Sequence, residues 1–301
     1  MSLAEEAVAA LALLVFAPLT VWAERKVKAW SQLRKGPSIL QPYRDLRRLA
    51  VKETLIPNTS TRLFRVAPFL AAGCVVAALF LLPLYDSGGG LGGSVALLVL
   101  ALLFTLQRAL MAAQAYDAGT AFEGIGSSRE LFLGGLGEPV FLLVAAAVYL
   151  ESGSARVPAQ HLVWGDPASW LIVGALAFAW LAEAARIPFD NPATHLELTM
   201  VHEALILESS GRPLALYELA GMWKQAILAG LLLLFVAPLP PTGPLRVALL
   251  GLGVILLSGV LALFEAGMAK VRLFRASHLL VMAALLAFLG GVVGYVEAGF
   301  V

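Results

Sequence analysis

Apolar residues along this chain gather into long runs separated by shorter polar segments. Eight runs reach about 20 mostly apolar residues, the length that an α-helix needs to cross a bilayer. They occupy residues 3–23, 66–84, 94–114, 131–150, 168–187, 220–238, 245–265 and 277–297. The pattern predicts an all-α integral membrane protein with eight transmembrane helices. Because neither an internal repeat nor a linker is visible, we expect residues 1–301 to form a single transmembrane domain.

Composition supports a membrane protein and excludes several kinds of site. The chain is 60% hydrophobic and 14% charged, whereas ordinary proteins are ~45–50% apolar and ~25% charged. Its single cysteine, Cys74, excludes an internal disulfide and a cysteine-ligated metal cluster. The four histidines show no metal-ligand spacing. We therefore expect no catalytic residue, metal site or bound cofactor here, and any electrons must travel through other chains.

Basic residues are distributed unevenly between the two sides of the predicted helices. The first connection, 24–65, holds eleven of them, and the third, fifth and seventh connections with adjoining helix ends bring the total to nineteen. The opposite side holds only Arg156 and Arg246. Because basic residues favour the cytoplasmic side, both termini are predicted to lie outside. The cytoplasmic loops are then the long ones, at 24–65, 115–130, 188–219 and 266–276.

The first cytoplasmic loop carries a second kind of pattern. Pro42 suits a helix start, and Tyr43, Leu46 and Leu49 follow at helical spacing with basic residues between them. This pattern is typical of an amphipathic helix at the membrane surface. Its charge fits attraction to lipid headgroups, and it also fits the docking of a soluble partner. The residues we assign to docking, here and in the 186–190 turn, are Glu24, Arg25, Arg34, Lys35, Arg47, Arg186 and Asp190.

Carboxylates lie in or beside the third and fourth apolar runs. Glu130 and Glu138 are eight residues apart, so a helix places them within roughly a quarter turn of each other. A carboxylate at membrane depth costs ~2.5–3.5 kcal/mol, which makes a functional role the default interpretation. The alternative for Glu138 is a protonated acid hydrogen-bonded to a neighbouring helix. Glu123 is equally well explained as a solvated loop acid.

The richest polar segment follows the fifth apolar run. Glu183 and Arg186 are spaced to form a structural ion pair. Asn191 and Pro192 suggest a helix start, so we expect a helix from Pro192 to about Ser209 that ends at Gly211. Its histidines, His195 and His202, fit polar packing better than a proton relay. Chains of buried acids carry protons in membrane proteins, and the predicted path here consists of Glu130, Glu138, Glu183, Glu197 and Glu203.

Motifs in these segments resemble a known family. Glu24-Arg25-Lys26-Val27, Arg34-x-Gly36-Pro37, Gln41-Pro42 and Glu183-x-x-Arg186-x-Pro188-Phe189-Asp190 are similar to the heel subunit of respiratory complex I, which lies beside the quinone chamber. Residues 117–130, 190–204 and 268–275 look closer to its relative in formate hydrogenlyase and energy-converting nickel–iron hydrogenases. The similarity spans nearly the whole chain.

The resemblance implies eight helices and the role of a membrane anchor and ion-conducting coupling subunit of an energy-converting hydrogenase. Such a subunit links redox chemistry in a peripheral arm to proton or sodium movement. The family's acids equivalent to Glu130, Glu183, Glu197 and Glu203 line the ion path, and its Arg186–Asp190 loop faces the electron-transfer subunit.

The resemblance also implies partners and a location. The partners are hydrogenase large and small subunits, an iron–sulfur subunit and antiporter-like membrane subunits. Iron–sulfur clusters and a nickel–iron centre are then held by those partners. The location is a bacterial or archaeal cytoplasmic membrane, with lipids as neighbours and no nucleic acid.

Two alternatives remain open from the sequence. The chain is similar enough to complex I to be the quinone-chamber subunit of an NADH or ferredoxin:quinone oxidoreductase. Against this, the acid-rich stretch that complex I has after Asp190 is replaced by Asn191-Pro192-Ala193-Thr194-His195. A stand-alone ion transporter is the third reading, although the long basic loop and the lack of a visible inverted repeat weigh against it.

Overall fold

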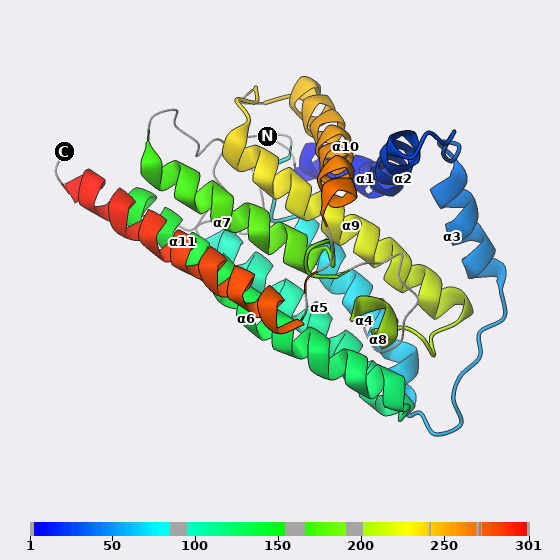
Figure 1. Cartoon of the computed structure of the whole chain (residues 1–301). Helices are drawn as coiled ribbons and strands as arrows, with labels where there is room; N and C mark the ends of the chain where they lie inside the picture. Colours follow the sequence, from blue (N-terminus) through cyan, green and yellow to red (C-terminus); the bar gives the residue numbers. More distant parts are fainter. Residues whose placement is uncertain are drawn as a thin grey trace.

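The protein is a bundle of long α-helices (Figure 1). This computed structural model describes residues 3–84, 95–153, 166–190, 201–240, 242–268, 271 and 273–299. The helices are α1 Leu3–Phe16, α2 Pro18–Ser31, α3 Gln41–Val51, α4 Arg62–Leu79, α5 Ala96–Ala118, α6 Ala121–Ser152, α7 Pro167–Glu183, α8 His202–Leu205, α9 Gly211–Val236, α10 Pro244–Gly267 and α11 Leu273–Gly299.

Seven helical segments in the described part of the chain are long and apolar enough to cross a membrane. One of them is α1 and α2 taken together, and the others are α4, α5, α6, α9, α10 and α11. The multi-pass helical membrane fold predicted from the sequence is thereby confirmed. The remaining predicted run, 168–187, corresponds to α7, which is apolar but has only 17 residues.

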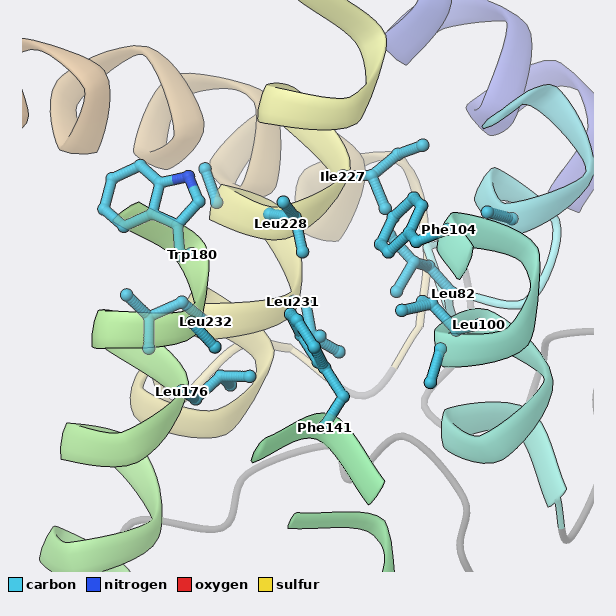
Figure 2. Close-up of a cluster of buried hydrophobic side chains, with 14 of the residues drawn as sticks. Leu82, Leu100, Phe104, Phe141, Leu176, Trp180, Ile227, Leu228, Leu231 and Leu232 are labelled. Atoms are coloured by element: carbon cyan, nitrogen blue, oxygen red, sulfur yellow. The ribbon is translucent and has the colours of Figure 1, made fainter. Parts of the chain in front are cut away.

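Helix α9 lies at the centre of the bundle, where α7 packs on one side and α4 on another, while α6 and α7 both pack along α11 (Figure 1). Figure 2 shows the apolar core around α9, which includes Leu228 and Leu231 of α9, Phe104 of α5, Phe141 of α6 and Trp180 of α7. Residues 226–236 of α9 are apolar on all sides, so this half of the helix is stable only when surrounded by other helices. This central helix also brings polar side chains into the core.

A proline separates α1 from α2 and leaves a carbonyl for another helix to use. Pro18 has no N–H, so the carbonyl of Leu14 cannot accept the usual bond from the residue four positions later. Trp223 of α9 donates to that carbonyl instead, at 3.0 Å. The next carbonyl, of Val15, accepts a 2.7 Å bond from the hydroxyl of Tyr43. The carbonyl groups at the break between α1 and α2 therefore form hydrogen bonds with both α9 and α3.

The predicted amphipathic helix is present as α3, with Pro42 in its first turn as expected. It stands at one side of the bundle and packs against α9 and α2 (Figure 1).

Two predicted connections differ from the structure. The loop expected at 115–130 is wrong, because only Gly119 and Thr120 separate α5 from α6. Gly119 has a left-handed backbone (φ 72°), which ends α5. The ten residues that follow Thr120 are helical, and two of their polar side chains, Glu123 and Ser127, are buried.

The helix expected from Pro192 to Ser209 is also not found as predicted. Residues 191–200 lie outside the described part, and the described remainder contains only the short α8. Gly211 begins α9 rather than ending the earlier helix. A side chain at Gly211 would meet the 52–54 segment at 2.7–2.8 Å, so this glycine permits a close approach between two chain segments.

Candidate functional site

The interior of the bundle holds a cluster of ionisable side chains around Arg108 of α5. The Arg108 guanidinium donates to Glu138 Oε1 at 2.6 Å and to Glu183 Oε1, and its Nε lies 3.5 Å from Glu130 Oε1. Arg108 and Glu183 are almost fully buried, while Glu130 and Glu138 are partly exposed. One cation therefore joins three of the five acids predicted for the proton path.

Helix α6 leaves room for this guanidinium by using a glycine. A Cβ on Gly134 would lie 2.3 Å from Arg108 Nη1, whereas a Cβ on Gly135 would meet nothing within 4 Å. Glu130 and Glu138 are on the same helix, two turns apart, and share one face as their spacing predicted. Both reach Arg108. The local sequence of α6 thus supplies two acids and the gap between them for the cation.

Lys224 of α9 completes what we call the Arg108 cluster: Arg108, Glu130, Glu138, Glu183 and Lys224. Its Nζ lies 2.5 Å from Glu183 Oε2 and donates to Gln107 Oε1 at 3.2 Å. The same Nζ is 5.3 Å from the ring centre of Phe104, which is a cation–π distance. With all groups ionised, the cluster has three negative and two positive charges. It can therefore hold one additional proton without acquiring a net positive charge.

The predicted ion pair between Glu183 and Arg186 is wrong. Glu183 binds Arg108 and Lys224, while Arg186 pairs with Glu24 Oε2 at 2.7 Å. Local spacing suggested the pair, but α7 ends at Glu183 and the chain turns, so the two side chains leave in different directions.

A second charged group, which we call the Glu24 cluster, consists of Glu24, Arg186 and Gln225. Gln225 accepts from Arg186 at 2.5 Å and donates to Glu24 Oε1. Gln225 is next to Lys224 in α9, and Arg186 follows Glu183 by three residues. The backbone therefore connects the two clusters twice, once through residues 224 and 225 of α9 and once through residues 183–186. Close by, Lys28 pairs with Glu265, which also accepts from the backbone N–H of Ile187 at 3.4 Å.

A cavity of about 370 Å³ opens beside the Glu24 cluster. The ionisable residues that line it include Glu24, Arg186, Asp190, His202, Glu203 and Glu218. A smaller cavity of about 30 Å³ touches Glu183 and Lys224 and shares His202 and Tyr217 with the larger one. This volume is enough for one water molecule. The arrangement places polar space between the larger cavity and the Arg108 cluster.

The structure also places the residues assigned to docking. Arg25, Arg34, Lys35 and Arg47 are exposed. Glu24 and Asp190 are buried, and Asp190 accepts bonds from the backbone N–H groups of Val201 and His202 at 3.3 and 3.0 Å. Of the five proton-path acids, Glu203 lines the larger cavity, and Glu197 lies outside the described residues.

Several site residues were missed by reasoning from sequence. Arg108 and Lys224 were counted among cytoplasmic charges, but both are buried in the bundle, and removing them lowers that count from nineteen to seventeen. Glu123 was assigned to a solvated loop as one alternative, and this is wrong because it is fully buried in α6. The available signal was the position of Arg108 within an apolar run, since a charge there requires a buried partner.

Comparisons with known proteins agree with this architecture. A family model described as NADH dehydrogenase matches residues 5–295. Hydrogenase-4 component C of Escherichia coli (strain K12) is 31% identical over 279 residues, covering 90% of this chain and 88% of that protein. Formate hydrogenlyase subunit 4 of the same organism is 33% identical over 289 residues, covering 91% and 92%.

More distant relatives share the fold. NADH-ubiquinone oxidoreductase chain 1 of Pongo pygmaeus is 29% identical over 223 residues, covering 70% of this chain and 68% of that protein. A chain of the membrane-bound sulfane sulfur reductase, an archaeal respiratory membrane complex, aligns with a TM-score of 0.75 over 97% of this chain and 99% of its own, at 18% identity. The second likeness concerns the fold alone.

Proposed function

Given that this chain belongs to the NADH dehydrogenase family, the family of complex I subunit 1/H, we propose that it is the membrane anchor and ion-conducting coupling subunit of an energy-converting hydrogenase. It would link redox chemistry in a peripheral arm to proton or sodium movement. The two E. coli relatives at 31% and 33% identity, named as hydrogenase-4 and formate hydrogenlyase components, support this choice over other complexes of the family.

The observation that carries the proposal is the Arg108 cluster. Buried ion pairs are poor stabilisers, because desolvation offsets much of their attraction. Five ionisable groups at the meeting of α5, α6, α7 and α9 are therefore hard to explain by stability alone. Three acids that share two cations compete for the same partners, so a proton arriving at one acid frees a cation to bind another more closely.

The two linked clusters suggest how redox chemistry would be coupled to this site. A charge change near the larger cavity acts first on Glu24 and Arg186. Gln225 and the 183–186 turn connect that pair to Lys224 and Glu183 within a few residues. Movement of either segment changes the balance of charge around Glu183, whose two cations come from different helices.

The central test replaces Glu183 with glutamine, which keeps the size and hydrogen bonding but removes titration. We expect the complex to assemble and to keep hydrogenase activity with an artificial electron donor, while ion translocation driven by the complete reaction falls strongly. Glu197→Gln is expected to behave in the same way. Full translocation in an assembled Glu183→Gln complex would show that Glu183 is not a required carrier.

Docking of the peripheral arm is the second part of the proposal. The partners would be hydrogenase large and small subunits, an iron–sulfur subunit and antiporter-like membrane subunits, and the metal centres would belong to them. Arg34, Lys35 and Arg47 are exposed and suit contact with a soluble subunit. Reversing all three to Glu should release the arm from membranes. Retention of the arm would mean that these residues contact only lipid.

Topology is the third part. We propose that α7 is an eighth span, that both termini lie outside, and that the membrane is a bacterial or archaeal cytoplasmic membrane. In a Cys74→Ser background, Ser38→Cys should react with an impermeant thiol reagent only from the cytoplasmic side. Ser87→Cys and Ser154→Cys, which lie outside the described residues, should react only from the other side. Reaction of Ser38→Cys from the outer side would reverse the orientation.

A quinone-chamber role is the second candidate, favoured by the larger cavity with its mixed lining of charged residues and of Tyr217, Met222 and Ile206. The subunits that copurify with the chain distinguish the two candidates. A large subunit with two Cys-x-x-Cys pairs supports the hydrogenase, whereas its absence together with quinone reduction supports the alternative.

A further inference from the structure

Glu123, in the first turn of α6, is buried in an unusual way. The residue is fully buried, and its Oε1 accepts a 3.0 Å bond from the backbone N–H of Glu208. Its Oε2 is buried and has no hydrogen-bond partner among the described residues. One half of this carboxyl group is therefore satisfied, and the other half points into the protein without a bond.

No ion pair involves Glu123 in the described part of the chain, in contrast to Glu183 with its two cations. The ionisable groups that interact with Glu123 are Glu208 and Tyr217, which are both acids. Burying a carboxylate without a counter-charge costs far more than burying the neutral acid. The lack of a cation among these neighbours therefore favours the neutral acid, with its proton on Oε2.

Tyr217, one of the two acids that interact with Glu123, belongs to a polar network next to the Arg108 cluster. Tyr217 of α9 donates its hydroxyl hydrogen to Gln114 Oε1, and Gln114 in turn donates to Ser209 Oγ at 2.8 Å. Tyr217 also lines the 30 Å³ cavity that touches Glu183 and Lys224. On the other side, Glu208 is exposed. Glu123 thus interacts with an acid at the surface and with a tyrosine that lines a cavity inside.

We propose that Glu123 is a proton-carrying group on a second access route to the Arg108 cluster, which runs from Glu208 past Tyr217. The proposal rests on the ion-conducting function proposed above. The O–H bond of Glu123 breaks and its proton passes to the Tyr217 hydroxyl oxygen, while the hydrogen of that hydroxyl passes to a water molecule in the 30 Å³ cavity. Glu183 accepts a proton from this water. A proton from solvent at Glu208 then reprotonates Glu123. This route would begin at the 206–210 turn rather than at the larger cavity.

The first experiment measures the proton itself. Infrared spectra of the intact complex at neutral pH, in an ester-free detergent, are compared between wild type and Glu123→Gln. We expect the wild type to show the carbonyl band of a protonated carboxyl group and the variant to lack it, while Glu208→Gln leaves it unchanged. Identical spectra for wild type and Glu123→Gln would overturn the proposal, whatever the outcome of the Glu183 test.

The second experiment measures transport in membrane vesicles. Glu123→Gln should lower redox-driven proton uptake about tenfold, less than the ~10²–10⁴-fold typical for loss of a proton-transfer group, because the route from the larger cavity remains. Glu123→Asp should restore part of the uptake. The matched variant Glu53→Gln removes an exposed acid outside the route and should leave uptake unchanged, whereas Glu208→Gln removes the acid at the start of the route and should lower uptake. Full uptake in an assembled Glu123→Gln complex would overturn the route. If Glu183→Gln also leaves uptake intact, the proposed function fails with it; if Glu183→Gln abolishes uptake, only the route through Glu123 fails.

Discussion

The carboxyl groups of Glu183 and Glu123 are both buried in helical segments, yet the charges around them differ. Glu183 contacts Arg108 and Lys224, supplied by two different helices. Glu123 contacts one backbone N–H and no cation in the described part of the chain. The difference shows that burial alone does not define the state of an acid, since nearby charges decide whether it is ionised. It also divides the interior into a region dense in charge and one that is polar but neutral.

The largest expected effect comes from removing the cation of the charged region. Arg108→Leu leaves Glu183, Glu130 and Glu138 without their shared partner, and loss of one member of a buried ion pair costs about 3–5 kcal/mol. We expect a strongly lowered thermal denaturation midpoint in detergent. The exposed Arg47→Leu serves as the control and should not change that midpoint. An unchanged midpoint for Arg108→Leu would mean that the three acids are neutral, as we infer for Glu123.

Next in size is a change that displaces Arg108 without removing it. Gly134→Ala places a methyl group 2.3 Å from the guanidinium, and such overpacking costs about 1–3 kcal/mol. Gly135→Ala is the matched control, because its methyl group meets nothing within 4 Å. Denaturation of the two variants should differ clearly. Equal stability would show that the guanidinium can move away at little cost.

Replacing each of the two buried acids with glutamine tests the comparison directly. Glu183→Gln removes a charge that two cations require, so we expect a loss of about 1–3 kcal/mol with the fold retained. Glu123→Gln exchanges one neutral group for another and keeps an oxygen for Glu208 N–H, so its loss should be under about 1 kcal/mol. Parallel thermal denaturation of the two variants gives the answer. A larger loss for Glu123→Gln would contradict the neutral state.

A smaller effect than that of Glu183→Gln is expected for the hydroxyl of Tyr217, in the neutral region. Tyr217→Phe removes the bond to Gln114, worth about 1 kcal/mol, while Gln114 keeps its bond to Ser209. Tyr116→Phe, which alters an exposed hydroxyl, is the control. A loss for Tyr217→Phe as large as that for Arg108→Leu would mean that this region is coupled to the charged one by more than a single hydrogen bond.

Hydropathy along the chain determined the fold class and the approximate position of most spans. The eight-residue spacing of Glu130 and Glu138 placed them on one face of a helix, and in the structure both reach Arg108. These properties depend on neighbours a few residues away in sequence, so local patterns are sufficient to predict them. The amphipathic helix α3 followed from the same kind of pattern.

Only the tertiary structure decided which charged and polar side chains meet. Arg108 and Glu183 are 75 residues apart in sequence, and Glu24 and Gln225 are 201 apart, so their pairing depends on which helices pack together. Local spacing favoured Glu183 with Arg186, but the turn after α7 sends these side chains to different helices. From the sequence, Glu123 could be explained as a solvated loop acid. It is buried because α6 packs against the 206–208 turn. Helix formation is a local property of the sequence, whereas the state of a buried charge depends on all the groups that the fold brings around it.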